Sequence, residues 1–101
     1  MDQQEKEFQI AGKSVRRAEK SQMFGKPCFK INGKAFCCFF ENSMVFKLGG
    51  DQHMAALKLK GSKLFDPSGK GRAMKEWVQV PYDHSENWEK FAKSAATYVG
   101  S

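Results

Sequence analysis

Apolar and aromatic residues concentrate between positions 23 and 40, in two runs that flank the pair Asn32-Gly33. An Asn-Gly pair between alternating hydrophobic residues is the strongest short-range signal for a two-residue β-hairpin, because both turn positions need a positive φ. The pattern therefore predicts a hairpin with strands over 28–31 and 34–40. Pro27 lacks a backbone donor and suits the start of the first strand.

A two-residue turn at this place fixes which side chains share a face of the sheet. We expect the core face to carry Phe29, Ile31, Phe36, Cys38 and Phe40. The opposite, part-exposed face would carry Cys28, Lys30, Ala35, Cys37 and Phe39. In this register Cys28 lies directly opposite Cys37.

Hydrophobic spacing predicts the remaining elements. Residues 1–22 show apolar positions at helical spacing, and residues 1–21 are expected to form a partly frayed helix or tail. Further strands are predicted over 44–48, 63–65 and 74–80, and helices over 52–60 and 85–98, the first burying Met54 and Leu57. The order α-β-β-β-α-β-β-α indicates one α+β domain over 1–101, a two-layer sandwich whose antiparallel sheet carries its helices on one face.

One sheet face is a candidate binding surface. If Val78 and Val80 fill the core, Trp77 points to the other face, where Phe39 and Val45 are also expected. Tryptophan is enriched at interaction hot spots, so Phe39, Val45 and Trp77 could anchor a protein partner or a second copy of the chain. The alternative is that a bulge reverses Trp77 and makes it a core residue.

The chain of 101 residues carries a net charge of +6, and its basic residues crowd one stretch. These are Lys58, Lys60, Lys63, Lys70, Arg72 and Lys75, with Asp66 as the one acid among them. They are candidate nucleic-acid contacts, although a solvated face is the commoner meaning of such a stretch. The loop Gly69-Lys70-Gly71 lacks the Ser or Thr and the spacing of a phosphate-binding P-loop.

Cysteine usage favours a reducing compartment, because the count of three is odd and Cys37 and Cys38 are adjacent. The charged N-terminus is not a secretory signal, and no apolar run could span a bilayer, so we expect a cytoplasmic protein without membrane contact. Cys28 and Cys37 fall at a predicted non-hydrogen-bonded pair, which allows a disulfide under oxidation. The alternative is that both stay reduced and act as small apolar residues.

No arrangement of residues predicts catalysis. The three cysteines cannot all point to one side of a hairpin, and His53 and His84 lie on other elements, so a metal site is not expected. No Cys or Ser stands beside a base that a third group could orient. The sequence predicts no enzyme, cofactor or metal, and favours a protein-binding module, with a nucleic-acid-binding accessory protein as the alternative.

Together these segments resemble the N-terminal domain of the TfoX/Sxy family. The residues that carry the resemblance are Met23-Phe24-Gly25, the hairpin through Gly33-Lys34-Ala35-Phe36, the strand 44–48, Leu64-Phe65, and the closing strand 74–81 with its helix. The resemblance covers roughly residues 22–99 and implies a secretion-chaperone-like α/β sandwich. Two-domain members of the family are implicated in regulating natural competence, and no family motif marks a catalytic residue here. The chain departs from the family at Lys26-Pro27, where many relatives carry another glycine.

Overall fold

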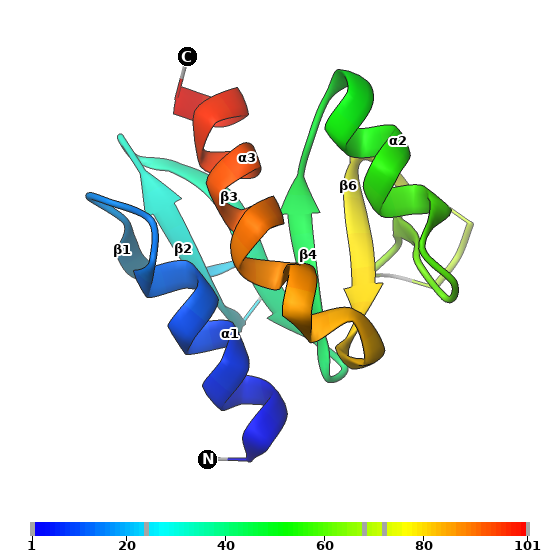
Figure 1. Cartoon of the computed structure of the whole chain (residues 1–101), viewed down its shortest axis with the longest axis horizontal. Helices are drawn as coiled ribbons and strands as arrows, with labels where there is room; N and C mark the ends of the chain where they lie inside the picture. The colour runs from blue at the N-terminus through cyan, green and yellow to red at the C-terminus, as the bar shows by residue number, and fades with distance from the viewer. Residues whose placement is uncertain (1, 24, 68, 72, 101) are drawn as a thin grey trace.

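In the computed structural model, which describes residues 2–23, 25–67, 69–71 and 73–100, one antiparallel sheet carries its α-helices on a single face (Figure 1). The helices are α1 (Gln3–Lys13), α2 (Gly50–Lys58) and α3 (Trp88–Gly100), with a 3-10 helix η1 (Tyr82–Asn87) leading into α3. The strands are β1 (Glu19–Met23), β2 (Lys26–Ile31), β3 (Lys34–Phe40), β4 (Ser43–Lys47), β5 (Lys63–Phe65) and β6 (Met74–Pro81), in the spatial order β1-β2-β3-β4-β6-β5.

The predicted α+β class, helix placement and element order are confirmed, and the structure adds the edge strand β1. Its sequence, Glu-Lys-Ser-Gln-Met, has no apolar alternation that would identify a strand. It forms by pairing along the whole of β2, from Glu19 opposite Lys30 to Met23 opposite Lys26. Charged residues on an edge strand also discourage pairing with another chain.

Helices α1 and α3 cover the central strands. The apolar stripe of α3 is buried as expected, and the ring of Phe91 lies 5.7 Å from that of Phe46 on β4. In α1, Phe8 is fully buried, with its ring centroid 5.2 Å from that of Phe29 and 5.4 Å from that of Phe39. The helix expected within residues 1–22 is present as α1, and it supplies part of the core.

A β-bulge in the β2–β3 hairpin overturns the predicted register. Next to the turn, Ile31 pairs with Lys34 and Lys30 with Ala35, as expected. Phe29 then pairs with Cys37, so Phe36 is the extra residue of β3, and Cys28 pairs with Cys38. A bulge places two residues of one strand opposite one residue of its partner, and Phe36 and Cys37 both join the helix-covered core.

Beyond the bulge every side chain of β3 faces the side opposite to the prediction. Phe39 contacts the core beneath the helices, whereas Cys38 and Phe40 belong to a cluster on the other face. The predicted pairing of Cys28 with Cys37 is wrong for the same reason, since these two residues lie in different clusters. The helix-covered core also holds Met44, Phe46, Leu48, Val78 and Val80, so the condition set for Val78 and Val80 is met.

The face without helices has a small core of its own. Its buried members are Cys28, Cys38, Val45, Phe65 and Trp77, with Met23, Ala35, Phe40 and Met74 partly buried around them. Phe40 on β3 and Phe65 on β5 are separated by two strands, yet their rings meet edge to face at 5.2 Å. The sheet therefore curls toward this face, which fits the extra twist that bulges introduce near Phe36 and between Leu64 and Phe65.

Helix α2 covers β6 with a different face from the one predicted. Met54 and Leu57 were expected to be buried and are exposed, while Ala56 is fully buried. The Nε2–H group of His53 donates a hydrogen bond to the carbonyl oxygen of Lys75, at 2.8 Å. This bond and the small side chain of Ala56 orient the helix and let it lie close to β6.

We predict that Phe8→Ala lowers the free energy of unfolding by about 3–5 kcal/mol, because it removes a fully buried ring from the core. Ile10→Ala on the same helix is the control, since Ile10 is 53% exposed and its loss changes stability by about 0.5 kcal/mol or less. Urea unfolding measures both. Equal effects of the two changes would contradict a packed α1.

We also predict that Gly12→Ala destabilises the protein although it raises helix propensity. A Cβ at Gly12 would overlap the ring of buried Phe29, and such crowding costs about 1–3 kcal/mol, against a propensity gain of about 1 kcal/mol. Gly100→Ala in α3 is the matched control, because its Cβ would meet nothing closer than 3.9 Å. Thermal unfolding compares the two; a stabilising Gly12→Ala would refute the close contact.

A cationic groove beside helix α3

The three anchors predicted for one sheet face are not gathered on an exposed surface. Val45 has no exposed surface and Trp77 is 7% exposed, because both lie within the small core of that face. Trp77 points away from the helices, as expected, but it is buried there. Phe39 lies on the opposite face, against Phe8. The three predicted anchors therefore do not form one exposed surface.

The predicted nucleic-acid contacts are on the surface but do not form a phosphate-binding loop. Lys58, Lys60, Lys63, Lys70 and Lys75 are all exposed, and Arg72 lies outside the described residues. The carboxylate of Asp66 accepts hydrogen bonds from the backbone N–H groups of Gly69 at 3.0 Å and Gly71 at 2.9 Å. An internal carboxylate thus occupies the donors that a phosphate would need.

Both histidines hydrogen-bond to the backbone of another element. Nε2 of His53 lies 2.8 Å from the carbonyl oxygen of Lys75, and Nε2 of His84 lies 2.8 Å from that of Lys60. Within the described ranges, no three His, Cys, Asp or Glu side chains gather as a metal site would require. In the same residues, no helix combines the length and apolar character that crossing a bilayer demands.

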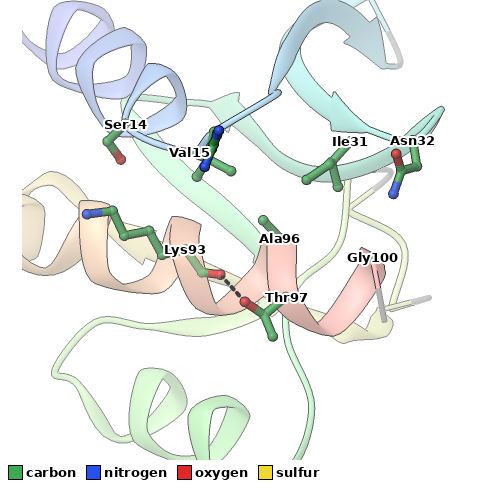
Figure 2. A pocket seen from close by; sticks show the side chains of 9 residues that line it. Ser14, Val15, Ile31, Asn32, Lys93, Ala96, Thr97 and Gly100 are labelled. Carbon is green, nitrogen blue, oxygen red and sulfur yellow. Dashed lines mark hydrogen bonds between the residues drawn. The ribbon is translucent and has the colours of Figure 1, made fainter.

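A groove of about 560 Å³ lies between the segment after α1, the β2–β3 turn and α3 (Figure 2). The residues that line it are Ser14, Val15, Arg16, Ile31, Asn32, Lys93, Ala96, Thr97 and Gly100. Figure 2 shows Ser14 and Val15 on one side and Lys93, Ala96 and Thr97 along α3 on the other. Ile31 and Asn32 come from the tip of the hairpin.

The groove combines aliphatic surface with positive charge. Val15, Ile31 and Ala96 provide apolar surface and belong to, or contact, the helix-side core. The exposed side chains of Arg16 and Lys93 are the ionisable groups, and none of these nine described lining residues is acidic or aromatic. We call this the cationic groove.

More positive charge gathers where α1 leads into β1. Lys20 lies beside Lys13, and the repulsion between the two ammonium groups lowers the pKa of Lys20. Arg16 and Arg17 lie between them in the sequence, and Arg17 adopts a positive φ of 70°. Like charges held this close favour an anion nearby, because an anion would relieve their repulsion.

Two other hollows flank the same helices. An acidic hollow, lined by Glu7, Glu86 and Glu89 among others, lies between the middle of α1, η1 and the start of α3. On the α2 side of α3, a hollow of about 370 Å³ is lined by residues that include Lys93, Gln52 and Tyr98. The line of contact between α1 and α3 thus begins at an acidic hollow and ends at the cationic groove.

Tyr98 ties α3 to strand β6. Its hydroxyl donates a short hydrogen bond to the carboxylate of Glu76, and its ring lies over Gly49, where a Cβ would overlap it. The bond to Glu76, together with partial burial, raises the pKa of Tyr98 above its usual value. The neutral phenol is the donor, so ionisation would break this contact.

We predict that Glu76→Gln returns the pKa of Tyr98 toward the ordinary tyrosine value of about 10. The folded state holds the phenol proton more tightly than the unfolded chain, so the stability from this bond is present below that ordinary value and is lost as the pH rises through the raised one. Phenolate absorbance in a Tyr82→Phe background, which leaves Tyr98 as the single tyrosine, reports the titration. An unchanged titration in Glu76→Gln would refute the prediction.

Sequence reasoning missed the cationic groove because its lining residues come from three segments that are far apart in the chain. The one local indication of the groove is the pair Arg16-Arg17 after the first helix. From sequence alone, such a pair is explained by the preference of cations for the C-terminal end of a helix. Comparison of the chain with family models, with curated proteins and with solved structures gave no match.

Proposed function

We propose that this protein is a small, non-enzymatic, cytoplasmic interaction module of the TfoX N-terminal type, and that it binds an acidic segment of a protein partner in the cationic groove. The observation that carries the proposal is the composition of the groove. It offers aliphatic surface between the exposed side chains of Arg16 and Lys93, with no acid among its lining residues, and Lys93 is ion-paired at 3.1 Å with Glu89 one turn earlier on α3. The α+β arrangement with helices on one face supports the family part of the proposal.

The chemistry of the groove favours a peptide over a nucleic acid. Single-stranded nucleic acids are held by aromatic side chains on which the bases stack, and the groove has none. A peptide with alternating acidic and aliphatic side chains would place carboxylates near Arg16 and Lys93 and its apolar side chains against Val15, Ile31 and Ala96. Arginine suits this role because its planar guanidinium binds a carboxylate through two hydrogen bonds.

The exposed lysines of residues 58–75 support the alternative, a nucleic-acid-binding accessory protein. They lie around the edge strand β5 and the ends of α2 and β6, which pair or contact one another. Such a surface would neutralise phosphates without reading bases, so binding would weaken steeply with salt. The two proposals use different lysines, which makes them separable by mutation.

We predict that a fluorescein-labelled peptide of alternating Glu and Leu binds the wild-type protein, and that the double variant Arg16→Glu, Lys93→Glu weakens this binding by about tenfold or more, which corresponds to at least about 1.4 kcal/mol. Lys63→Glu is the charge-reversal control, because Lys63 is exposed on β5, outside the groove. Fluorescence polarisation measures affinity. An amide NMR titration then locates the peptide, with shifts expected at Ile31 and Asn32.

Three results would overturn the proposal. The first is equal affinity for a Lys-Leu peptide of the same length. The second is tighter binding of a thymidine oligonucleotide that Lys63→Glu weakens, which would favour the nucleic-acid alternative. The third is a concentration-dependent dimer that Arg16→Glu abolishes, which would make a second copy of the chain the occupant of the groove.

A further inference from the structure

The three thiols are divided between the two faces of the sheet. All three cysteines are free and buried. Cys37 lies in the helix-side core, whereas Cys28 and Cys38 lie together in the small core of the other face. Cys28 on β2 and Cys38 on β3 are direct cross-strand partners. The bulge at Phe36 is what brings this pair together and separates Cys37 from it.

The cross-strand position of this pair suits a disulfide. Pairs in an antiparallel hairpin alternate between hydrogen-bonded and non-hydrogen-bonded sites, starting with a hydrogen-bonded pair next to a two-residue turn. With Ile31 and Lys34 as the first pair, and the bulge opposite Phe29, Cys28 and Cys38 occupy a non-hydrogen-bonded site. Cα atoms at such a site lie about 4.5 Å apart, within the range that a disulfide spans.

From this geometry we propose that Cys28 and Cys38 form a redox-modification site, in which a hydroperoxide oxidises the pair to a cross-strand disulfide while Cys37 stays reduced. The thiolate sulfur of Cys28 attacks a peroxide oxygen, the O–O bond breaks, and water leaves, so that Cys28 becomes a sulfenic acid. The sulfur of Cys38 then attacks the Cys28 sulfur, the S–O bond breaks, and a second water leaves. In total two thiols and one hydrogen peroxide give one disulfide and two waters.

The surroundings of the two sulfurs indicate that Cys28 reacts with the peroxide first and that Cys38 then attacks it. Burial raises the pKa of Cys28, but the charge of Lys30 and a hydrogen bond with Ser21 oppose that shift. Burial raises the pKa of Cys38 to about 12, and the neighbouring Cys28 adds to the shift. Cys28 therefore forms a thiolate more readily and reacts first. It also lies one strand from the sheet edge, opposite Ser21 of β1, where local opening is easiest.

Hydrogen peroxide treatment of the folded protein tests the site. The expected product loses two hydrogens by intact mass, and after trypsin it joins the peptide 21–30 to the peptide 35–47. Cys37 and Cys38 share the second peptide, so the variant Cys37→Ala identifies the partner. Wild type and Cys37→Ala should both form the bridge, and Cys28→Ser and Cys38→Ser should form none. Circular dichroism checks that each variant folds.

Two results would overturn the proposal. One is a bridge from Cys28 to Cys37, found by tandem mass spectrometry of the folded wild type, which needs no variant. The other is absence of any bridge in the folded protein under conditions that oxidise the same chain in urea. Arg16 and Lys93 play no part in the bridge, so failure of peptide binding in the cationic groove leaves this proposal standing, and the reverse also holds.

Discussion

The arrangement of the core depends on one extra residue in β3. With Phe36 inserted opposite Phe29, two successive side chains point to the helices, and the alternation resumes in the opposite phase. The helix-covered core gains Cys37 and Phe39, the second of which contacts Phe8 of α1. The other face gains Cys38 and Phe40. A regular hairpin would leave α1 without one of the rings it covers, and would leave the far face without the ring that meets Phe65.

Both faces of the sheet are therefore buried, although helices cover only one (Figure 1). On the near face, α1 and α3 bury the side chains of the sheet. On the far face, curvature of the sheet buries them, because it brings side chains from distant strands together. As a result, Val45 and Trp77 are buried on the far face, where Lys26 lies over the ring of Phe40 at 5.8 Å from its centroid. The cationic groove lies on the helix side.

Sequence patterns predicted the parts of this structure that local chemistry determines. The Asn32-Gly33 turn, the alternation of β4, and the apolar stripe of α3 each depend on a few neighbouring residues. The patterns failed where a distant segment decides. Strand β1 is extended because it pairs with β2, and its own residues do not predict a strand. The bulge was missed because no residue near Phe36 is typical of one. The cationic groove was missed for the same reason, since it forms only when α1, the hairpin tip and α3 meet.

Opposite charges follow one another along the line where α1 meets α3. Glu7, Glu86 and Glu89 line the hollow at its beginning, and Arg16 and Lys93 line the cationic groove at its end. The two sites are joined by an ion pair, because Nζ of Lys93 lies 3.1 Å from the carboxylate of Glu89 one turn earlier on α3. An anion in the cationic groove would therefore compete with Glu89 for Lys93. Breaking an exposed pair of this kind costs only about 1 kcal/mol or less, so the pair would tune binding in the groove without closing it.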